Sequence, residues 1–164
     1  MKVYTTLLLM TFMLVAGCKS NSAFDYSQAI VKIETDFAAE IIPADKRVSE
    51  FLDSDQHDSA AIFTQQMEDL AEKRLAQVRD LKAPNVKEAE NFKLAAIRYF
   101  TYLKTMYTAF NNFTKASTEE AKEAERVRLA KIVADKDDAT RTLQLAQQKF
   151  AAANNFRIEK ASSK

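Results

Sequence analysis

Apolar residues recur every three or four positions along most of the chain beyond residue 23. This spacing places them on one face of a helix and predicts amphipathic helices that pack around a shared core. The most regular stripe alternates spacings of three and four, as in a heptad seam, and consists of Ala89, Phe92, Ala96, Tyr99, Leu103, Met106, Phe110 and Phe113. Three further stripes run over 26–51, 58–81 and 129–153. The pattern therefore predicts four long helices.

Polar and turn-forming residues mark the expected helix ends. The segment 53–58, rich in Asp and Ser, is typical of a turn that caps a helix. Asn85, after Pro84, predicts a side-chain N-cap for the third helix. Ser117 with Glu120 predicts a capping box for the fourth.

Three residues interrupt the stripes. Pro43 removes a backbone donor inside the first helix, so we expect a kink or break near Ile42. Arg74 interrupts the second stripe, and Lys136 falls where the fourth stripe predicts an apolar residue. The polar stretch 135–138 around Lys136 can fix helix register or bind a partner, although a locally hydrated stretch is the favoured interpretation.

Short connections between successive helices favour antiparallel neighbours. We therefore expect an all-α fold, an elongated up-down-up-down four-helix bundle over 24–157, with a frayed tail over 158–164. The start of the first helix and the turn 81–86 then lie at one end. The turns 53–58 and 114–117 lie at the other.

The chain begins with a short targeting pattern. Met1 and Lys2 precede a mostly apolar run that is too short to span a bilayer and is typical of a signal segment. This run ends in Val15-Ala16-Gly17-Cys18. In these residues the chain resembles a bacterial lipoprotein precursor, whose lipobox is an apolar residue, two small residues and an invariant Cys. Beyond them it resembles only loosely the small all-helical surface lipoproteins without assigned activity.

The resemblance implies a set of processing steps. Cleavage between Gly17 and Cys18 removes residues 1–17 as a signal peptide, and Cys18 then carries a diglyceride thioether, often with an added acyl chain. Several acyl chains anchor a protein stably, so residues 18–23 become the lipidated Cys and a tether. Lys19, in place of an Asp, favours the outer membrane over the inner membrane. A periplasmic and a surface-facing position both stay open.

Composition narrows the possible chemistry. The single Gly, Gly17, excludes glycine-rich phosphate loops, and the single Cys excludes an intrachain disulfide and a Cys-based zinc site. His57 is the only His, so a multi-His metal site is also excluded. A net charge of +1 gives no electrostatic basis for nucleic-acid binding. Without a visible catalytic set we expect no enzyme, no metal and no cofactor.

Candidate sites remain on the helix faces. Arg98 and Tyr102 lie off the heptad seam and, if exposed, suit a protein-contact patch. An apolar ligand pocket is a second candidate, against core packing as the favoured alternative, and its lining residues are Tyr99, Met106, Tyr107 and Phe110. The tripeptide Asp58-Ser59-Ala60 resembles an O-glycosylation acceptor of some bacterial envelope proteins.

Together these features predict a lipid-anchored helical binding or scaffolding module of the bacterial cell envelope. It is expected to contact the membrane through lipidated Cys18 and another envelope protein through its helices. The alternative is a carrier or sensor of a small apolar ligand held between the helices.

Overall fold

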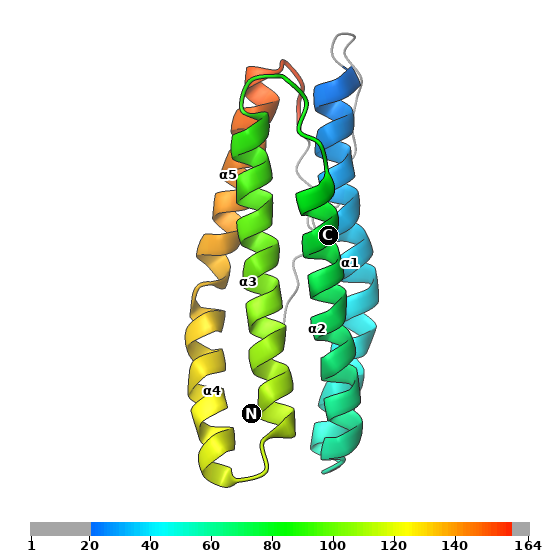
Figure 1. Ribbon diagram of the computed structural model, residues 1–164, viewed down its shortest axis with the longest axis vertical. Helices are drawn as coiled ribbons and strands as arrows, with labels where there is room; N and C mark the ends of the chain where they lie inside the picture. Colours follow the sequence, from blue (N-terminus) through cyan, green and yellow to red (C-terminus); the bar gives the residue numbers. More distant parts are fainter. Residues whose placement is uncertain (1–20, 159–164) are drawn as a thin grey trace.

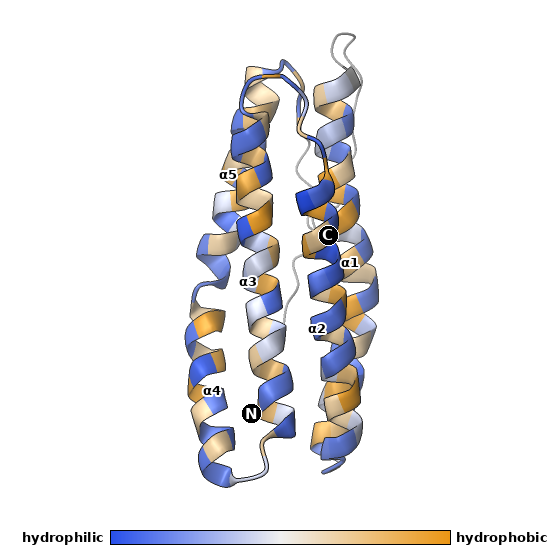
Figure 2. Cartoon of the chain, viewed as in Figure 1, coloured by the Kyte–Doolittle hydropathy of each residue, from blue (hydrophilic) through white to orange (hydrophobic). Residues whose placement is uncertain are grey.

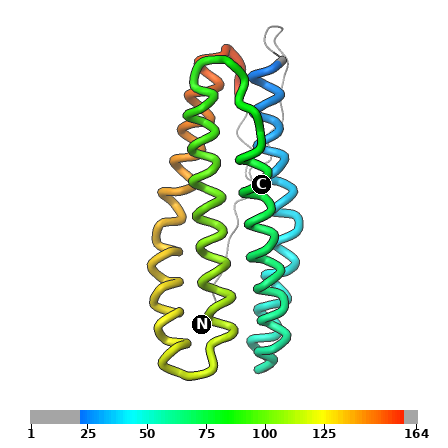
Figure 3. The backbone as a smooth tube through the Cα atoms, in the orientation of Figure 1, coloured from blue at the N-terminus to red at the C-terminus, as the bar shows by residue number. Residues whose placement is uncertain are grey.

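The computed structural model describes residues 21–158, and the regular secondary structure within this range is helical throughout (Figure 1). Five helices follow one another, namely α1 (Asn21–Asp53), α2 (His57–Asp80), α3 (Ala89–Lys115), α4 (Glu119–Ala134) and α5 (Lys136–Ala153). The tube in Figure 3 shows α4 and α5 succeeding each other along one side of the molecule. The predicted all-α class, with four helical rods packed together, is confirmed.

The expectations for the lipobox and for the end of the tail lie outside the described residues. These are the cleavage at Gly17 and Cys18, the lipidation of Cys18 and the fraying of residues 159–164. Of the predicted tether 18–23, residues 21–23 belong to the first turn of α1.

The helices pack in chain order. The ring of Phe51 in α1 lies 5.5 Å from that of Phe63 in α2, while Glu40 contacts Arg74, so these two helices run in opposite directions. In turn, α2 packs on α3, and α3 packs on both α4 and α5. Figure 1 shows two ends, which we name here. The near end holds the start of α1, residues 81–88 and residues 154–158, and the far end holds residues 54–56 and 116–118.

The heptad seam of α3 forms the centre of the core. Its first six members are buried, from Ala89 to Met106, and the two at its end are half-buried. Phe100 and Tyr107, which lie beside the seam, are at most 2% exposed. Both rings meet Phe37 of α1 edge to face at 6.0 Å. The apolar face of α3 is therefore wider than the seam, and α1 covers the additional width.

An aromatic cluster closes the near end. Phe150 of α5 stacks on Phe92 of α3 at 5.3 Å and meets Tyr26 of α1 edge to face at 6.0 Å. Beyond α5 the chain turns back, and Phe156 contacts both Phe150 and Phe24. Buried aromatic pairs of this geometry contribute about 1 kcal/mol each beyond area burial. The start of α1 and the end of α5 are thus held together.

Three local predictions, one inside a helix and two at helix N-termini, differ from the structure. Of the kink or break expected near Ile42, the break is absent, because α1 continues through the exposed Pro43. Burial of Ile41 and Val48 on either side outweighs the roughly 3 kcal/mol that an interior proline costs. Asn85 is not an N-cap, since α3 begins at Ala89 and the cap position is Glu88 in a left-handed conformation, with φ 63°.

The third correction concerns α4. The predicted capping box of Ser117 with Glu120 is displaced by one residue, because Thr118 is the N-cap and its hydroxyl accepts a hydrogen bond from the Ala121 amide at 3.1 Å. Thr118 adopts the extended backbone that an N-cap requires.

The predicted fourth helix is broken in two. The Asp135 amide donates a hydrogen bond to the carbonyl of Ile132, three residues back, and this tighter turn ends α4. The Asp135 carbonyl accepts a hydrogen bond from the Ala139 amide in the first turn of α5. Asp135, at the interruption, is exposed. The polar intrusion at 135–138 therefore corresponds to a change of helix.

Candidate functional site

The near end lies beside the predicted attachment point. Helix α1 begins at Asn21, three residues after Cys18. Residues 81–88 and Arg157 surround the same end, and Lys82, Lys87 and Arg157 are exposed. Lys93 instead turns inward and donates to the Leu81 carbonyl at 2.6 Å. This end can therefore present positive charge next to whatever Cys18 is attached to.

The predicted contact patch of Arg98 and Tyr102 is divided by the structure. Arg98 is exposed, but Tyr102 is half-buried against the core, and its hydroxyl contacts the Met106 sulfur at 3.7 Å. Burial raises the pKa of Tyr102 to about 12, and the carboxylates of Asp135 and Asp137 add to the shift. Tyr102 thus faces the α4–α5 break and offers little free aromatic surface.

The predicted pocket residues are core residues. Tyr99, Met106 and Tyr107 are each at most 9% exposed, and Phe110 packs against the same core. Burial raises the pKa of Tyr107, with smaller effects from Asp45, Tyr99 and Tyr102. These side chains make contacts that core packing alone explains.

A carboxyl group is enclosed near Tyr99. Burial raises the pKa of Glu34 on α1 to about 7. Burial also raises the pKa of Tyr99, and the nearby Glu34 adds to this effect. Periodicity does not reveal the proximity of Glu34 and Tyr99, because Glu34 lies next to a position of the first apolar stripe without occupying it. Among the acidic side chains in the described part of the chain, Glu34 is the one whose pKa is raised into the neutral range.

A polar network that sequence reasoning missed joins α2 to α3. Asn111 donates to the Glu68 carboxylate at 2.6 Å and to Gln65 at 2.9 Å, and the Thr64 hydroxyl donates to the Asn111 amide oxygen at 3.3 Å. Thr64 also shares a 2.8 Å hydrogen bond with Thr114. Thr64, Asn111 and Thr114 are buried. Hydrogen bonds within the network satisfy these buried polar groups. The network therefore fixes the register of α2 against α3 and leaves few polar groups that could bind a ligand.

The acidic turn 53–58 forms the connection between α1 and α2. His57 Nε2 lies 2.9 Å from Asp55 Oδ1, and Asp58 falls in the first turn of α2, where negative charge is favourable. Within residues 21–158 no group of three or more His, Cys, Asp and Glu side chains is arranged to hold a metal ion. Asp58 is exposed and Ser59 half-exposed.

Helix α4 is unlike the other helices because none of its residues is buried. Leu129 and Ile132 lie half-buried on the core, while a second set of apolar residues faces solvent. Val127 is 46% exposed and Val133 is 37% exposed. We call the outer stripe of α4 the exposed residues Val127, Ala130, Val133 and Ala134. Figure 2 shows apolar and polar residues intermixed around this helix.

The spacing of the outer stripe, three and four residues from Val127 to Ala130 and on to Ala134, places these side chains along one face. This spacing is present in the sequence, but the neighbouring apolar positions Leu129 and Ile132 make the two faces of the helix hard to distinguish from periodicity alone. An apolar helix face without a partner within the monomer is the typical footprint of a helical or extended binding partner.

Among residues 21–158, no helix combines the length and the apolar character that a membrane crossing requires. Comparisons of the chain with protein-family models, with curated proteins and with solved structures found no match.

Proposed function

We propose that the chain is a lipid-anchored binding or scaffolding module of the bacterial cell envelope, with no enzymatic activity and no cofactor. In its mature form it is an elongated up-down-up-down four-helix bundle attached to the membrane, preferentially the outer membrane, through lipidated Cys18. Two features support the anchor. The lipobox pattern ends at Cys18, and the first helix begins three residues later, at Asn21.

The outer stripe of α4 is the observation that carries the binding role. A helix that buries none of its side chains contributes little to the core. Helix α4 is nevertheless capped by Thr118, and ion pairs link neighbouring turns on its surface. Helical stability in proteins comes mainly from an apolar face packed against a partner. The outer stripe supplies such a face for a second envelope protein.

Purification of the tagged, lipidated protein from envelope membranes tests both parts. Mass spectrometry of the mature N-terminal peptide should show a diglyceride thioether on Cys18, and Cys18→Ala should release the protein into the soluble fraction. An unmodified Cys18 in a membrane-free protein would contradict the anchor. Intact-complex mass spectrometry should then show a protein bound in fixed ratio.

Paired charge substitutions locate the contact. Val127→Lys with Val133→Lys should abolish the bound protein, because two charges enter an apolar interface. Ile62→Lys with Leu145→Lys is the matched control, since these residues are 60% and 49% exposed on α2 and α5. The control has the same added charge and should retain the partner. Equal recovery with both variants would exclude the outer stripe as the contact.

The patch predicted from the sequence is tested in the same purification. Arg98→Ala removes an exposed cation from α3 without touching the outer stripe. If the stripe is the contact, this variant keeps the bound protein. If Arg98→Ala loses the bound protein and the Val127/Val133 variant keeps it, the contact surface lies on α3 and not on the outer stripe.

A further inference from the structure

The two ends of the bundle differ in charge. For this comparison each end comprises its connecting residues and the terminal four residues of the helices that meet there. The near end holds four basic residues, Arg79, Lys82, Lys87 and Arg157, and three acidic residues, Asp80, Glu88 and Glu90. The far end holds two basic residues, Lys115 and Lys122, and six acidic residues, Glu50, Asp53, Asp55, Asp58, Glu119 and Glu120. Their formal balances are therefore +1 and −4.

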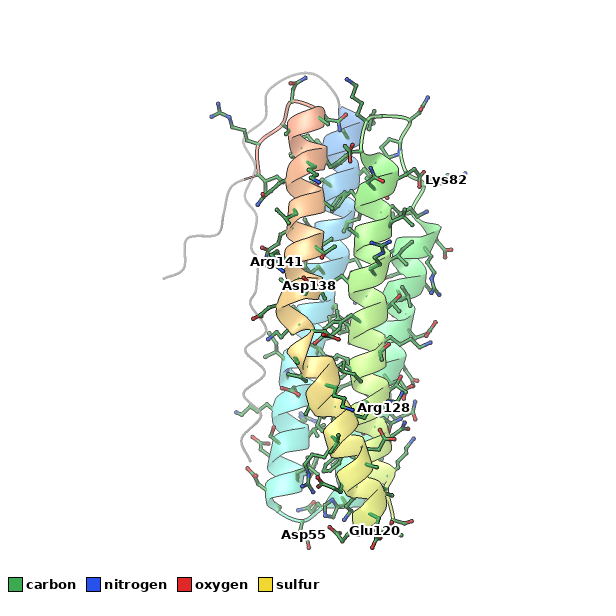
Figure 4. The ribbon with its side chains drawn as sticks, turned by 90° about the vertical axis from the view of Figure 1, so that its left-hand side faces the viewer. Asp55, Lys82, Glu120, Arg128, Asp138 and Arg141 are labelled. Carbon is green, nitrogen blue, oxygen red and sulfur yellow. The ribbon has the colours of Figure 1, made fainter. Side chains whose placement is uncertain are left out.

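Figure 4 shows this separation along the long axis, with Lys82 at one end and Asp55 and Glu120 at the other. Three of the near-end cations are also free to bind an external anion. Lys82, Lys87 and Arg157 are exposed, and their side chains make no hydrogen bond or ion pair with another residue in the range 21–158. The Glu88 carboxylate, by contrast, accepts a hydrogen bond from Asn91 at 2.9 Å.

The anchor places the near end against the lipid. Asn21 is the third residue after Cys18, and a chain of that length reaches at most about 10 Å. This is close to the Debye length of about 8–10 Å at physiological salt. Charges on the near end therefore act on the headgroups, whereas the far end lies roughly 40 Å away along a helix of 27 residues.

We propose that the near end docks on an anionic membrane surface. Lys82, Lys87 and Arg157 face acidic lipid headgroups, and the bundle stands on this end with its acidic far end directed away. If the bundle lay flat, it would bring the far-end carboxylates to the same negative surface, which repels them. The inference rests on the lipid anchor of the proposed function, because the anchor selects which end meets the membrane.

Fluorescence quenching in reconstituted vesicles measures the orientation. The lipidated full chain carries a dye at Asn85→Cys on the near end or at Ser117→Cys on the far end, and the acylated Cys18 sulfur does not compete for the label. Vesicles of phosphatidylcholine, with or without phosphatidylglycerol, carry a headgroup quencher. The Asn85 dye should be quenched more strongly in anionic vesicles than in neutral ones, and high salt should abolish the difference. The Ser117 dye should stay unquenched in both.

Charge-matched variants identify the responsible side chains. Lys82→Gln with Lys87→Gln and Arg157→Gln should reduce quenching of the Asn85 dye in anionic vesicles to the neutral-vesicle level. Lys46→Gln with Lys73→Gln and Lys131→Gln removes the same charge from exposed positions away from the near end and should leave the quenching unchanged. An equal effect of both triples would overturn the proposal, since net charge and not the near end would then be responsible.

The outcomes also separate this inference from the proposed function. Equal quenching of the Asn85 dye in neutral and anionic vesicles, with the thioether lipid present on Cys18, overturns the orientation and leaves the anchor intact. Absence of the lipid by mass spectrometry overturns the anchor, and the orientation with it.

Discussion

Arg74 of α2 pairs with Glu40 of α1, and the two partners lie in unequal surroundings. The Arg74 side chain is 8% exposed, whereas that of Glu40 is 55% exposed. Arg74 also donates to Gln77 at 2.9 Å, and its Nε has no hydrogen-bond partner among the described residues. The guanidinium therefore depends on Glu40 for charge compensation, while water can hydrate Glu40 without Arg74.

This inequality predicts unequal effects of two substitutions. Glu40→Ala leaves a buried cation without its carboxylate and should lower the free energy of unfolding by about 2 kcal/mol. Arg74→Met removes the buried charge, keeps most of the volume and should cost less than about 1 kcal/mol. Urea unfolding followed by circular dichroism measures both. Equal losses would show that the pair does not behave as a buried cation with a solvated partner.

Arg74 also shows what the sequence could predict about this interface. Its intrusion into the second stripe was visible, because position 74 falls on the apolar face. Its partner was not, since Glu40 lies 34 residues earlier and on another helix. Periodicity identifies the face on which a residue lies, but the pairing of faces requires the relative register of two helices.

The α2–α3 network predicts a large effect at Asn111. Asn111→Ala removes the partner of Thr64 and Glu68 and should lower the free energy of unfolding by about 2 kcal/mol. The neighbouring Asn112 is exposed, so Asn112→Ala should change it by less than about 0.5 kcal/mol. Chemical denaturation of both variants checks this contrast, and similar values would mean that the network contributes nothing to stability.

The near-end aromatic cluster predicts another contrast. Phe150 is 0% exposed, so Phe150→Ala should lower the free energy of unfolding by about 3–5 kcal/mol through lost burial and a cavity. Leu145 on the same helix is 49% exposed, and Leu145→Ala should have little effect. Thermal and urea unfolding compare the two. A small effect at Phe150 would show that α5 is not held by this cluster.

Glu34 predicts a pH dependence. Its carboxyl has a pKa of about 7 in the folded chain against 4.5 ordinarily, so folding favours the protonated form. Below about pH 4 both states are protonated and the group has no effect. As pH rises from about 4.5 to about 7 the unfolded state ionises first, so stability falls, and it then stays lower. The shift corresponds to a loss of about 3 kcal/mol.

Glu34→Gln separates this effect from general acid or base denaturation. The variant should be more stable than the wild type at about pH 8 and equal to it at about pH 4. Asp25→Asn, at an exposed position of the same helix, is the control. Urea unfolding at both pH values gives the difference. A Glu34→Gln variant that is less stable at high pH would reverse the sign and exclude an enclosed carboxyl.

The helix ends show why local signals place boundaries only approximately. The stripes located the helical stretches, because burial of an apolar face is a property of many residues together, but they did not show that the fourth stretch is two helices, α4 and α5. The caps depend on single dihedral angles, and adjacent residues can compete for the same role. Ser117 and Thr118 are both good N-caps, whereas Asn85 lost its role to Glu88 because the 81–88 connection is longer than the pattern suggested.

The competition at the start of α4 yields a direct test. Thr118→Ala removes the hydroxyl that accepts the Ala121 amide and should cost about 1 kcal/mol of helix stability, whereas Ser117→Ala should be neutral. Because α4 buries no side chain, the loss should appear as faster hydrogen exchange at amides of α4 and not as a lower global stability. If Ser117→Ala accelerates exchange and Thr118→Ala does not, the helix begins one residue earlier than described. If Thr118→Ala lowers global stability instead, α4 unfolds only with the core, and the outer stripe belongs to a helix held more firmly than its exposure indicates.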